Sequence, residues 1–379
     1  MMPDNQTGFA DETRISAGRR LLQRLHIDLP MLFGLLLLAT AGLFILYSAA
    51  DQNTDLIVRQ GMRLALAFAV MFVIAQFSPD TIRFWAPWLF GFGLLMLIAV
   101  LVVGEVGKGA QRWLDLGILR FQPSEIMKLG VPMMLAWYLA ETPLPPARGR
   151  IFIAAVILII PTLLIAKQPD LGTALLIASA GIFVLWLAGL SLRLVAAVFA
   201  LVAAITPVIW IYLMHDYQRR RVLTFLNPDI DPLGAGYHIR QSKIAIGSGG
   251  MYGKGWLNGT QSHLDFLPER STDFIFAVFA EEFGFLGLLV LLGMYLFVIW
   301  RGLYITAQAQ DTFCRLLAGS ITLTFFVYIF VNMGMVSGLL PVVGVPLPLL
   351  SYGGTSIVTL LAGFGILMSI QTHRKLIAT

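Results

Sequence analysis

The chain has 379 residues, of which 58% are hydrophobic and 12% are charged, and its formal net charge is +5. Soluble domains carry roughly 25% charged residues, so this composition excludes an ordinary soluble protein and indicates lipid as the main solvent. The net charge is too small to identify a partner. The single cysteine, Cys314, excludes an internal disulfide and any cysteine-based metal site.

The N-terminal 28 residues are polar and basic, and the apolar run 29–50 follows them. That run is too long for the hydrophobic region of a secretory signal and has no obvious cleavage site, so it predicts an uncleaved anchor. Further uncharged runs lie at 64–79, 84–104, 151–166, 171–192, 194–214 and 283–300. Most of them reach or approach the roughly 17 to 25 residues that a helix needs to cross the hydrocarbon. They lack the alternation of barrel strands, so helices are predicted.

The C-terminal part of the chain contains a long stretch without charge, 316–371. It is too long for one span and predicts two spans joined by a connector, because glycines and prolines between Gly338 and Gly354 would break a helix there. The predicted fold class is therefore all-α: a polytopic integral membrane protein with about ten transmembrane helices and one large extracytoplasmic loop.

Basic residues fix the expected orientation. They fall in alternate short loops or at the C-terminus, and by the positive-inside rule this places both termini in the cytoplasm. The basic residues are Arg148, Arg150, Arg193, Arg301, Arg315, Arg374 and Lys375. The expected organisation is a cytoplasmic tail at 1–28, one transmembrane domain at 29–372 with an extracytoplasmic loop at 215–272, and a second cytoplasmic tail at 373–379.

Many cations also lie in the loops expected outside the cytoplasm, where nucleic acid is the wrong partner. A lipid phosphate or diphosphate fits them better, because Lys and Arg form charge-assisted hydrogen bonds with phosphate. Contacts with lipid head groups or with the chain's own acids account for about half of them. The glycine-rich stretch 247–259 matches neither nucleotide-binding pattern, since Lys254 is followed by Gly255 rather than by Ser or Thr. A nucleotide-hydrolysing transporter is therefore disfavoured.

Asp273 stands where the loop meets a helix expected to start at Phe274. Thr272 or Asp273 could cap this helix, and its dipole would favour the negative charge. A carboxylate at the membrane surface could equally take a proton from a substrate hydroxyl. The residues alone leave both alternatives open, and Asp170, at the start of another span, has the same capping alternative.

Glu125 and Lys128 lie three residues apart on one helical face, within ion-pairing reach. Their helix can span only if it begins near Ser124, so the pair is expected at membrane depth. Such charges usually face a cavity or a partner and predict a site, with a purely structural ion pair as the alternative. Glu281 and Glu282 are expected to support the packing of a cavity wall.

The chain resembles the SEDS family (shape, elongation, division and sporulation) over nearly its whole length. The resemblance rests on GKGAQRWLDLG (107–117), RFQPSE (120–125), QPDLGT (168–173), HDYQRRRV (215–222), DPLGAGYHIRQSKIAIGSGG (231–250), GKGWLNGTQS (253–262), FLPERSTDFIFAVFAEE (266–282) and GVPLPLLSYGG (344–354). Relatives often carry His where this chain has Ser271, which argues against an imidazole as an obligatory base there.

The resemblance implies a peptidoglycan glycosyltransferase that polymerises lipid II at the outer face of the cytoplasmic membrane, in elongation rather than division. It implies a cognate class B penicillin-binding transpeptidase as partner, and undecaprenyl-diphosphate-linked glycan as the second substrate. No cofactor is required by the motifs, although a divalent cation on the diphosphate is compatible with them. Asp273 matches the family's essential acid. The residues expected to bind substrate are Arg120, Gln122, Ser124, Glu125, Lys128, Asp170, Arg219, Lys243, Gln261 and Ser351.

Two other classes of function remain as alternatives. A flippase or transporter of lipid-linked precursors would also need many helices, an intramembrane ion pair and broken helices, although no inverted repeat is obvious. A scaffold that only anchors a transpeptidase should tolerate Asp273→Asn. An assay of lipid II polymerisation in detergent distinguishes the enzyme from both the flippase and the scaffold.

Overall fold

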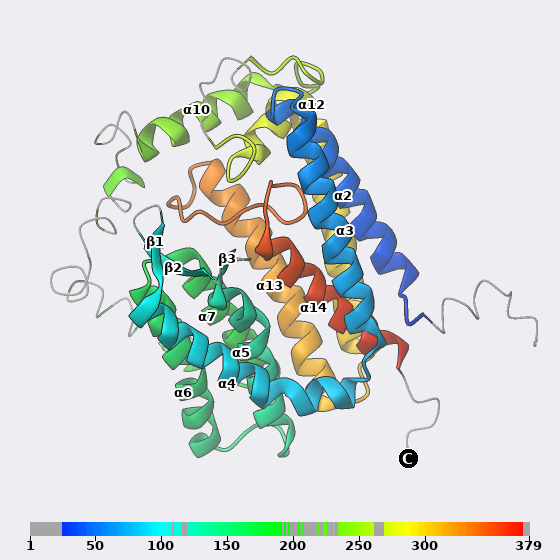
Figure 1. Cartoon of the computed structure of the whole chain (residues 1–379), viewed down its shortest axis with the longest axis vertical. Coiled ribbons are helices and arrows are strands. Elements are labelled where there is room, and N and C mark those ends of the chain that lie inside the picture. The colour runs from blue at the N-terminus through cyan, green and yellow to red at the C-terminus, as the bar shows by residue number, and fades with distance from the viewer. Residues whose placement is uncertain are drawn as a thin grey trace, which may run out of the picture.

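The structure is a computed structural model that describes residues 25–107, 110–115, 120–191, 234–260 and 269–373, with scattered positions between 193 and 230. Its long helices are α2 (Leu29–Ala49), α3 (Thr54–Gln76), α4 (Pro79–Val103), α5 (Pro123–Ala140), α6 (Arg148–Lys167), α7 (Leu171–Leu187), α10 (Ala235–Ser248), α12 (Ile275–Ala307), α13 (Thr312–Val336) and α14 (Thr355–Thr372) (Figure 1). The predicted helical membrane fold is confirmed.

Among the described residues, seven helices are long and apolar enough to cross a membrane: α2, α3, α4, α6, α12, α13 and α14. The apolar helix α7 is shorter, and α5 has 18 residues. The predicted span 194–214 lies almost entirely outside the described residues. The number of ten spans therefore stays a prediction, as does the extent of the extracytoplasmic loop.

At the start of several of these helices, a short polar side chain accepts a hydrogen bond from a backbone amide. Asp28 accepts from the amide of Met31 at 2.9 Å at the start of α2. Ser78 accepts from Thr81 at 3.3 Å before α4, whose first residue is Pro79. These are the signals expected at helix N-termini, because such oxygens satisfy amides that have no partner within the helix.

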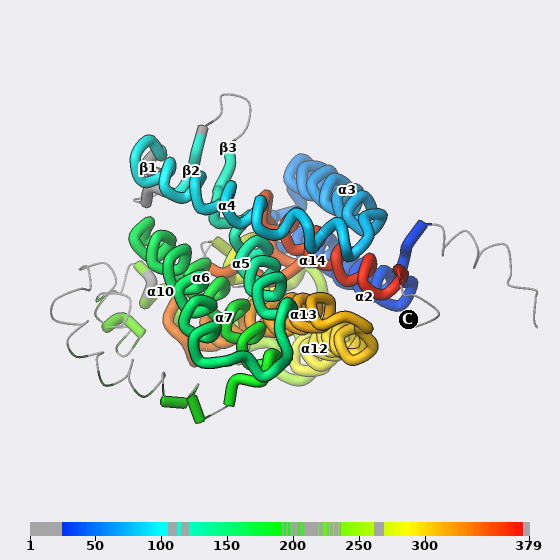
Figure 2. Tube along the Cα trace, turned by 90° about the horizontal axis from the view of Figure 1, so that it is seen from below, coloured from blue at the N-terminus to red at the C-terminus, as the bar shows by residue number. Residues whose placement is uncertain are grey.

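The two C-terminal helices form the interior of the bundle. In α13 and α14, 61% of the apolar window is buried, against 22% in α3, α4 and α6. α13 packs against α5, α7 and α12, whereas α14 packs mainly against α3 (Figure 2). The peripheral helices expose large apolar side chains: Phe84, Trp88 and Phe152 are 65%, 66% and 71% exposed. Such a surface suits lipid rather than water.

A non-helical connector joins α13 to α14 across residues 337–354. Gly338 and Gly344 adopt φ angles of 71° and 74°, a left-handed region that favours glycine. The prediction of two spans with a broken connector is confirmed. This connector packs against the turn that carries Asp273.

A small antiparallel sheet lies between α4 and α5, and the sequence did not predict it. Its strands are β1 (Glu105–Gly107), β2 (Ala110–Asp115) and β3 (Arg120–Phe121), in the order β1-β2-β3 within the described residues. Glycines on both sides of β2 make the segment read as a loop, and strands this short give little periodicity. The sheet places Arg112 on β2 close to the start of α7.

Helix α12 is broken at Gly284, where φ is 62° and ψ is −163°. The glycine-rich turn after α10 fills the break: the amide of Lys254 donates to the carbonyl of Glu281 at 3.0 Å, and the amide of Phe285 donates to Gly250 at 2.9 Å. A Cβ atom on Gly253 would lie 2.1 Å from the carbonyl oxygen of Glu282. These glycines therefore allow close backbone approach.

Candidate functional site

Asp273 lies in a turn that ends directly before α12. The helix begins at Ile275, and its N-cap is Phe274, which makes no side-chain capping hydrogen bond. The predicted start at Phe274 was therefore one residue early, and the N-cap position falls on neither Thr272 nor Asp273. The hydroxyl of Thr272 instead donates to the carboxylate of Glu269 at 2.8 Å.

The connector holds the backbone of this turn. Tyr352 donates its amide to the carbonyl of Ser271 at 2.8 Å, and the hydroxyl of Ser351 donates to the carbonyl of Thr272 at 2.6 Å. The side-chain amide of Asn332, on α13, donates to the carbonyl of Asp273 at 3.0 Å. The Asp273 carboxylate itself lies beside the connector, since its Oδ2 would be 3.5 Å from a Cβ atom on Gly344. The carboxylate is only partly buried.

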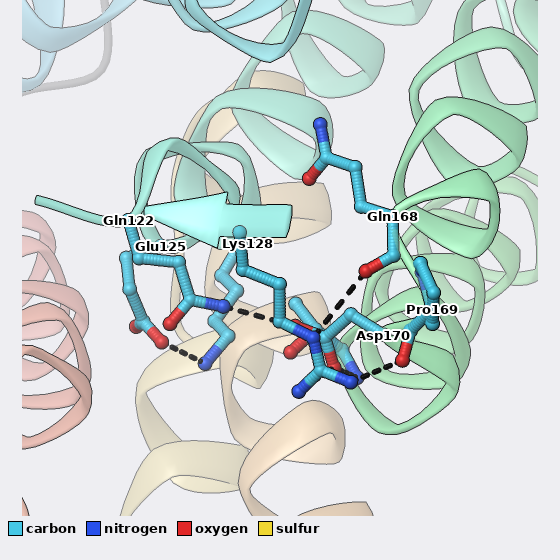
Figure 3. A network of polar contacts seen from close by, with 8 residues as sticks. Gln122, Glu125, Lys128, Gln168, Pro169 and Asp170 are labelled. Atoms are coloured by element: carbon cyan, nitrogen blue, oxygen red, sulfur yellow. Dashed lines mark hydrogen bonds and ion pairs between the residues drawn. The ribbon is translucent and has the colours of Figure 1, made fainter. Parts of the chain in front are cut away.

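Glu125 and Lys128 form the predicted ion pair, with Lys128 Nζ 2.7 Å from Glu125 Oε1 (Figure 3). Their helix α5 begins at Pro123, so the predicted start near Ser124 is confirmed. Among the described residues, Glu125 Oε2 and the hydroxyl of Ser124 are buried without a hydrogen-bond partner. Unsatisfied polar atoms in an apolar site are costly, which makes them candidates for contact with substrate or water.

Asp170 is the N-cap of α7 and also the centre of a polar network. Its Oδ1 accepts from the amide of Thr173 at 3.3 Å, and its Oδ2 accepts from Gln122 Nε2 at 2.9 Å (Figure 3). Arg112 Nη1 lies 3.8 Å from Asp170 Oδ1, and the same guanidinium donates to the carbonyl oxygens of Gln168, at 3.3 Å, and of Pro169. The network thus joins β2 and the starts of α5 and α7.

Two small adjoining hollows, together called the cleft, lie between the connector, α5, α13 and α14. One hollow is lined by the connector, from Pro346 to Leu349 with Ser351 and Gly353, and by residues of α14. A second hollow is lined by Lys128 and Pro132 of α5 and by residues of α13 and α14. Tyr328 and Leu360 line both hollows, so the two adjoin. The two hollows together extend from the connector to Lys128, whereas Asp273 lines neither of them and lies beside Gly344 of the connector.

Of the remaining predicted substrate-binding residues, Ser351 lines the cleft. Ser351 is 2% exposed, and its hydroxyl also accepts from the amide of Leu347 at 2.8 Å, so its hydrogen bonds are made within the chain. Lys243 is exposed on α10, with its ammonium group near Gly338. Arg120 lies in β3, Arg219 is partly exposed, and Gln261 lies outside the described residues.

Sequence reasoning missed Arg112 and Asn332 as site residues. Arg112 belongs to the motif 107–117, but it counted only as one of many extracytoplasmic cations. Asn332 lies in the stretch without charge, where a search for ionisable groups passes over it. Glu281 accepts from Lys254 Nζ at 2.6 Å, and Glu282 accepts from the hydroxyl of Ser48. Neither lines the hollows described above, so their support of a cavity wall stays a prediction.

The fold and the site define a polytopic membrane protein with a buried ion pair between its helices, whose lysine lines a hollow. The family model for FtsW, RodA and SpoVE, described as a cell cycle protein, matches residues 20–376. The chain therefore belongs to this family, which is the SEDS family indicated by the motifs, and it is an integral membrane protein.

Several relatives match almost the whole chain. The peptidoglycan glycosyltransferase MrdB of Escherichia coli K12 is 55% identical over 355 residues, covering 94% of this chain and 96% of that protein. The rod shape determining protein RodA of Thermus thermophilus is similar in structure, with 29% identity, a TM-score of 0.70 and coverage of 92% and 98%. A chain from a peptidoglycan synthase complex, in work on the coordination of polymerization and crosslinking, has a TM-score of 0.81, 32% identity and coverage of 92% and 99%.

Proposed function

We propose that this chain is a peptidoglycan glycosyltransferase that polymerises lipid II into glycan strands at the outer face of the cytoplasmic membrane during cell elongation. The MrdB relative at 55% identity carries the name of that activity. The structural observation that supports it most is the cleft itself. Lys128, of the buried Glu125–Lys128 pair, lines one end, and the connector that holds the turn of the partly exposed residue Asp273 lines the other.

In the proposed reaction, Asp273 acts as the general base. The acceptor is lipid II, and the donor is the growing glycan on its undecaprenyl diphosphate. The 4-hydroxyl oxygen of the acceptor GlcNAc attacks the anomeric carbon of the donor MurNAc, while its proton moves to Asp273. The bond to the diphosphate oxygen breaks, and the anomeric configuration inverts. Such general-base assistance typically contributes a factor of about 10² to 10⁴ in rate.

The departing diphosphate develops negative charge, which cations fixed in advance stabilise. Lys128 is such a cation, because the ion pair with Glu125 orients its ammonium group within the cleft. Arg120, Arg219 and Lys243 are further candidates on the basis of the family resemblance. The low dielectric of the cleft strengthens these interactions and helps to exclude water, which would otherwise hydrolyse the donor.

The same proposal includes a partner and an orientation. The partner is a cognate class B transpeptidase, which crosslinks the glycan; the relation to a chain from a peptidoglycan synthase complex supports it. Both termini lie in the cytoplasm, and the loop 215–272 lies outside it. No step of the proposed reaction needs a cofactor, and a divalent cation can accompany the diphosphate.

The test measures glycan formation from lipid II in detergent by the purified wild type, Asp273→Ala and Asp273→Asn, each with the cognate transpeptidase. Asp311→Asn is the matched control, because Asp311 is the N-cap of α13 and Asn caps equally well. Loss of polymer in folded Asp273 variants but not in the control supports the role of Asp273 as general base. Undiminished activity of Asp273→Asn contradicts it, and absence of polymer even from the wild type, with partner and ions varied, contradicts the glycosyltransferase.

A further inference from the structure

Asn332 links the turn that carries Asp273 to the connector that lines the cleft. It lies in α13, and its side chain is 0% exposed. Its Nδ2 atom donates to the carbonyl oxygen of Asp273 at 3.0 Å and to that of Val345 at 2.8 Å. Because carbonyl oxygens only accept, both contacts together require an amide group with two hydrogens.

The two carbonyls belong to segments with different parts in the proposed reaction. Asp273 supplies the proton acceptor, whereas Val345 directly precedes Pro346, the first connector residue that lines the cleft. On the other side of Val345, Gly344 lies beside the Asp273 carboxylate. One side chain thus fixes the position of the proposed base relative to the wall of the cleft.

The other hydrogen bonds to this turn are made to the peptide groups that precede Asp273. Ser351 and Tyr352 hold the carbonyls of Thr272 and Ser271, and both come from the connector. Asn332 comes from a helix in the interior of the bundle and holds the peptide of Asp273 itself. The side chain therefore ties the base to the rigid part of the fold.

Packing alone does not account for an amide at this place. Among the described residues, Asn332 Oδ1 is buried without a hydrogen-bond partner, which costs free energy that an apolar side chain of similar size would not. An apolar side chain would also deprive the carbonyl oxygens of Asp273 and Val345 of this donor, so the amide is suited to holding both of them at once.

We propose that Asn332 is a positioning residue for glycosyl transfer, which orients the Asp273 carboxylate toward the acceptor hydroxyl. The proposal rests on the proposed function. It predicts a loss of turnover rather than of substrate affinity, because a misplaced base affects the transition state more than binding.

The experiment compares Asn332→Leu, which keeps the branched shape but has no donor, with Ser320→Ala. Ser320 is the matched control, because it also lies in α13, is 0% exposed and donates to a carbonyl oxygen, that of Ala180, at 2.8 Å. Each variant is assayed with the transpeptidase over a range of lipid II concentrations, and its thermal unfolding in detergent is followed. Asn332→Asp, which keeps one donor when protonated, is a second variant in case the leucine variant does not fold.

We expect Asn332→Leu to lower kcat by about 10- to 100-fold, the scale of a small misplacement of a catalytic group, with KM changed less than about threefold. Asn332→Asp should fall between it and the wild type, and Ser320→Ala should keep kcat within about twofold.

Equal kcat values for folded Asn332 variants and Ser320→Ala would overturn the proposal, as would a rise in KM alone. These outcomes differ from a failure of the proposed function, in which the wild type itself makes no polymer.

Discussion

Lys128 Nζ lies 2.7 Å from Glu125 Oε1, in side chains that are only 10% and 6% exposed. The ring of Tyr328 lies near the ammonium group, with 5.5 Å from Nζ to the ring centroid. A charge this deep in a membrane protein is tolerated when its counter-charge is present, and it becomes expensive when the counter-charge is removed. The two residues should therefore behave as one unit.

Either Glu125→Gln or Lys128→Met alone should destabilise the fold by about 3–5 kcal/mol, because each leaves one buried charge without its partner. The double variant should recover much of that loss, although none of the three should polymerise lipid II normally. Thermal or denaturant unfolding in detergent checks this as a double-mutant cycle. A double variant as unstable as the sum of the single variants would show that the pair is not coupled.

Asp170→Asn should separate the capping role of this residue from its role in the network. Asn remains a good N-cap, so we expect stability to change by less than about 1 kcal/mol, whereas Asp170→Ala should cost about 1 kcal/mol more. Arg112 loses its ionic partner in both variants. We therefore expect the KM for lipid II to rise in both, in kinetic assays with the transpeptidase. An unchanged KM in Asp170→Asn would show that Asp170 acts only as a helix cap.

The local part of the site could be predicted from sequence. Glu125 and Lys128 meet because the geometry of one helix brings residues i and i+3 together. Gln122 and Asp170 are 48 residues apart, and Asn332 and Asp273 are 59 apart. Which distant polar residues meet depends on how the helices pack, and apolar lipid-facing helices carry little information about that packing.

The connector and the break in α12 show the same limit. Prolines and glycines between Gly338 and Gly354 predict a broken segment because they act on their own backbone. Gly284 is a single glycine in an apolar helix, a position where glycine is usually tolerated. Its break depends on the turn at Gly250 and Gly253, which inserts its own backbone there, and this partner lies in another part of the chain.

Gly253→Ala should destabilise the fold by about 1–3 kcal/mol or more. Its Cβ atom would lie 2.1 Å from the carbonyl oxygen of Glu282, and φ at this position is 79°, where a side chain is strained. Gly247→Ala is the matched control, because nothing lies within 4 Å of its Cβ position on α10. In thermal unfolding, the control should be unchanged or slightly more stable. Similar melting temperatures for both variants would contradict the role of close approach.

The stability of the protein should depend on pH through His26, next to the start of α2. Its ring stacks on that of His373 with a centroid distance of 3.8 Å, and its Nδ1 lies 3.2 Å from the hydroxyl of Thr372 at the end of α14. Burial, and secondarily the charge of His373, lowers the pKa of His26 from its ordinary value of 6.5. The unfolded chain then binds a proton more readily than the folded chain, so stability is complete above about pH 6.5 and falls as the pH drops below it.

Thermal unfolding in detergent at pH 7.5 and pH 5.5 measures this dependence. We expect the wild type to melt at a lower temperature at pH 5.5 than at pH 7.5. His26→Phe keeps a ring for stacking but cannot titrate, so it should narrow the difference between the two pH values, and any remainder reports the other titrating groups. A wild type with equal melting temperatures would contradict the lowered pKa. A His26→Phe variant with the full wild-type difference would assign the pH dependence to another residue, because the contribution of His26 is then absent from the measured stability.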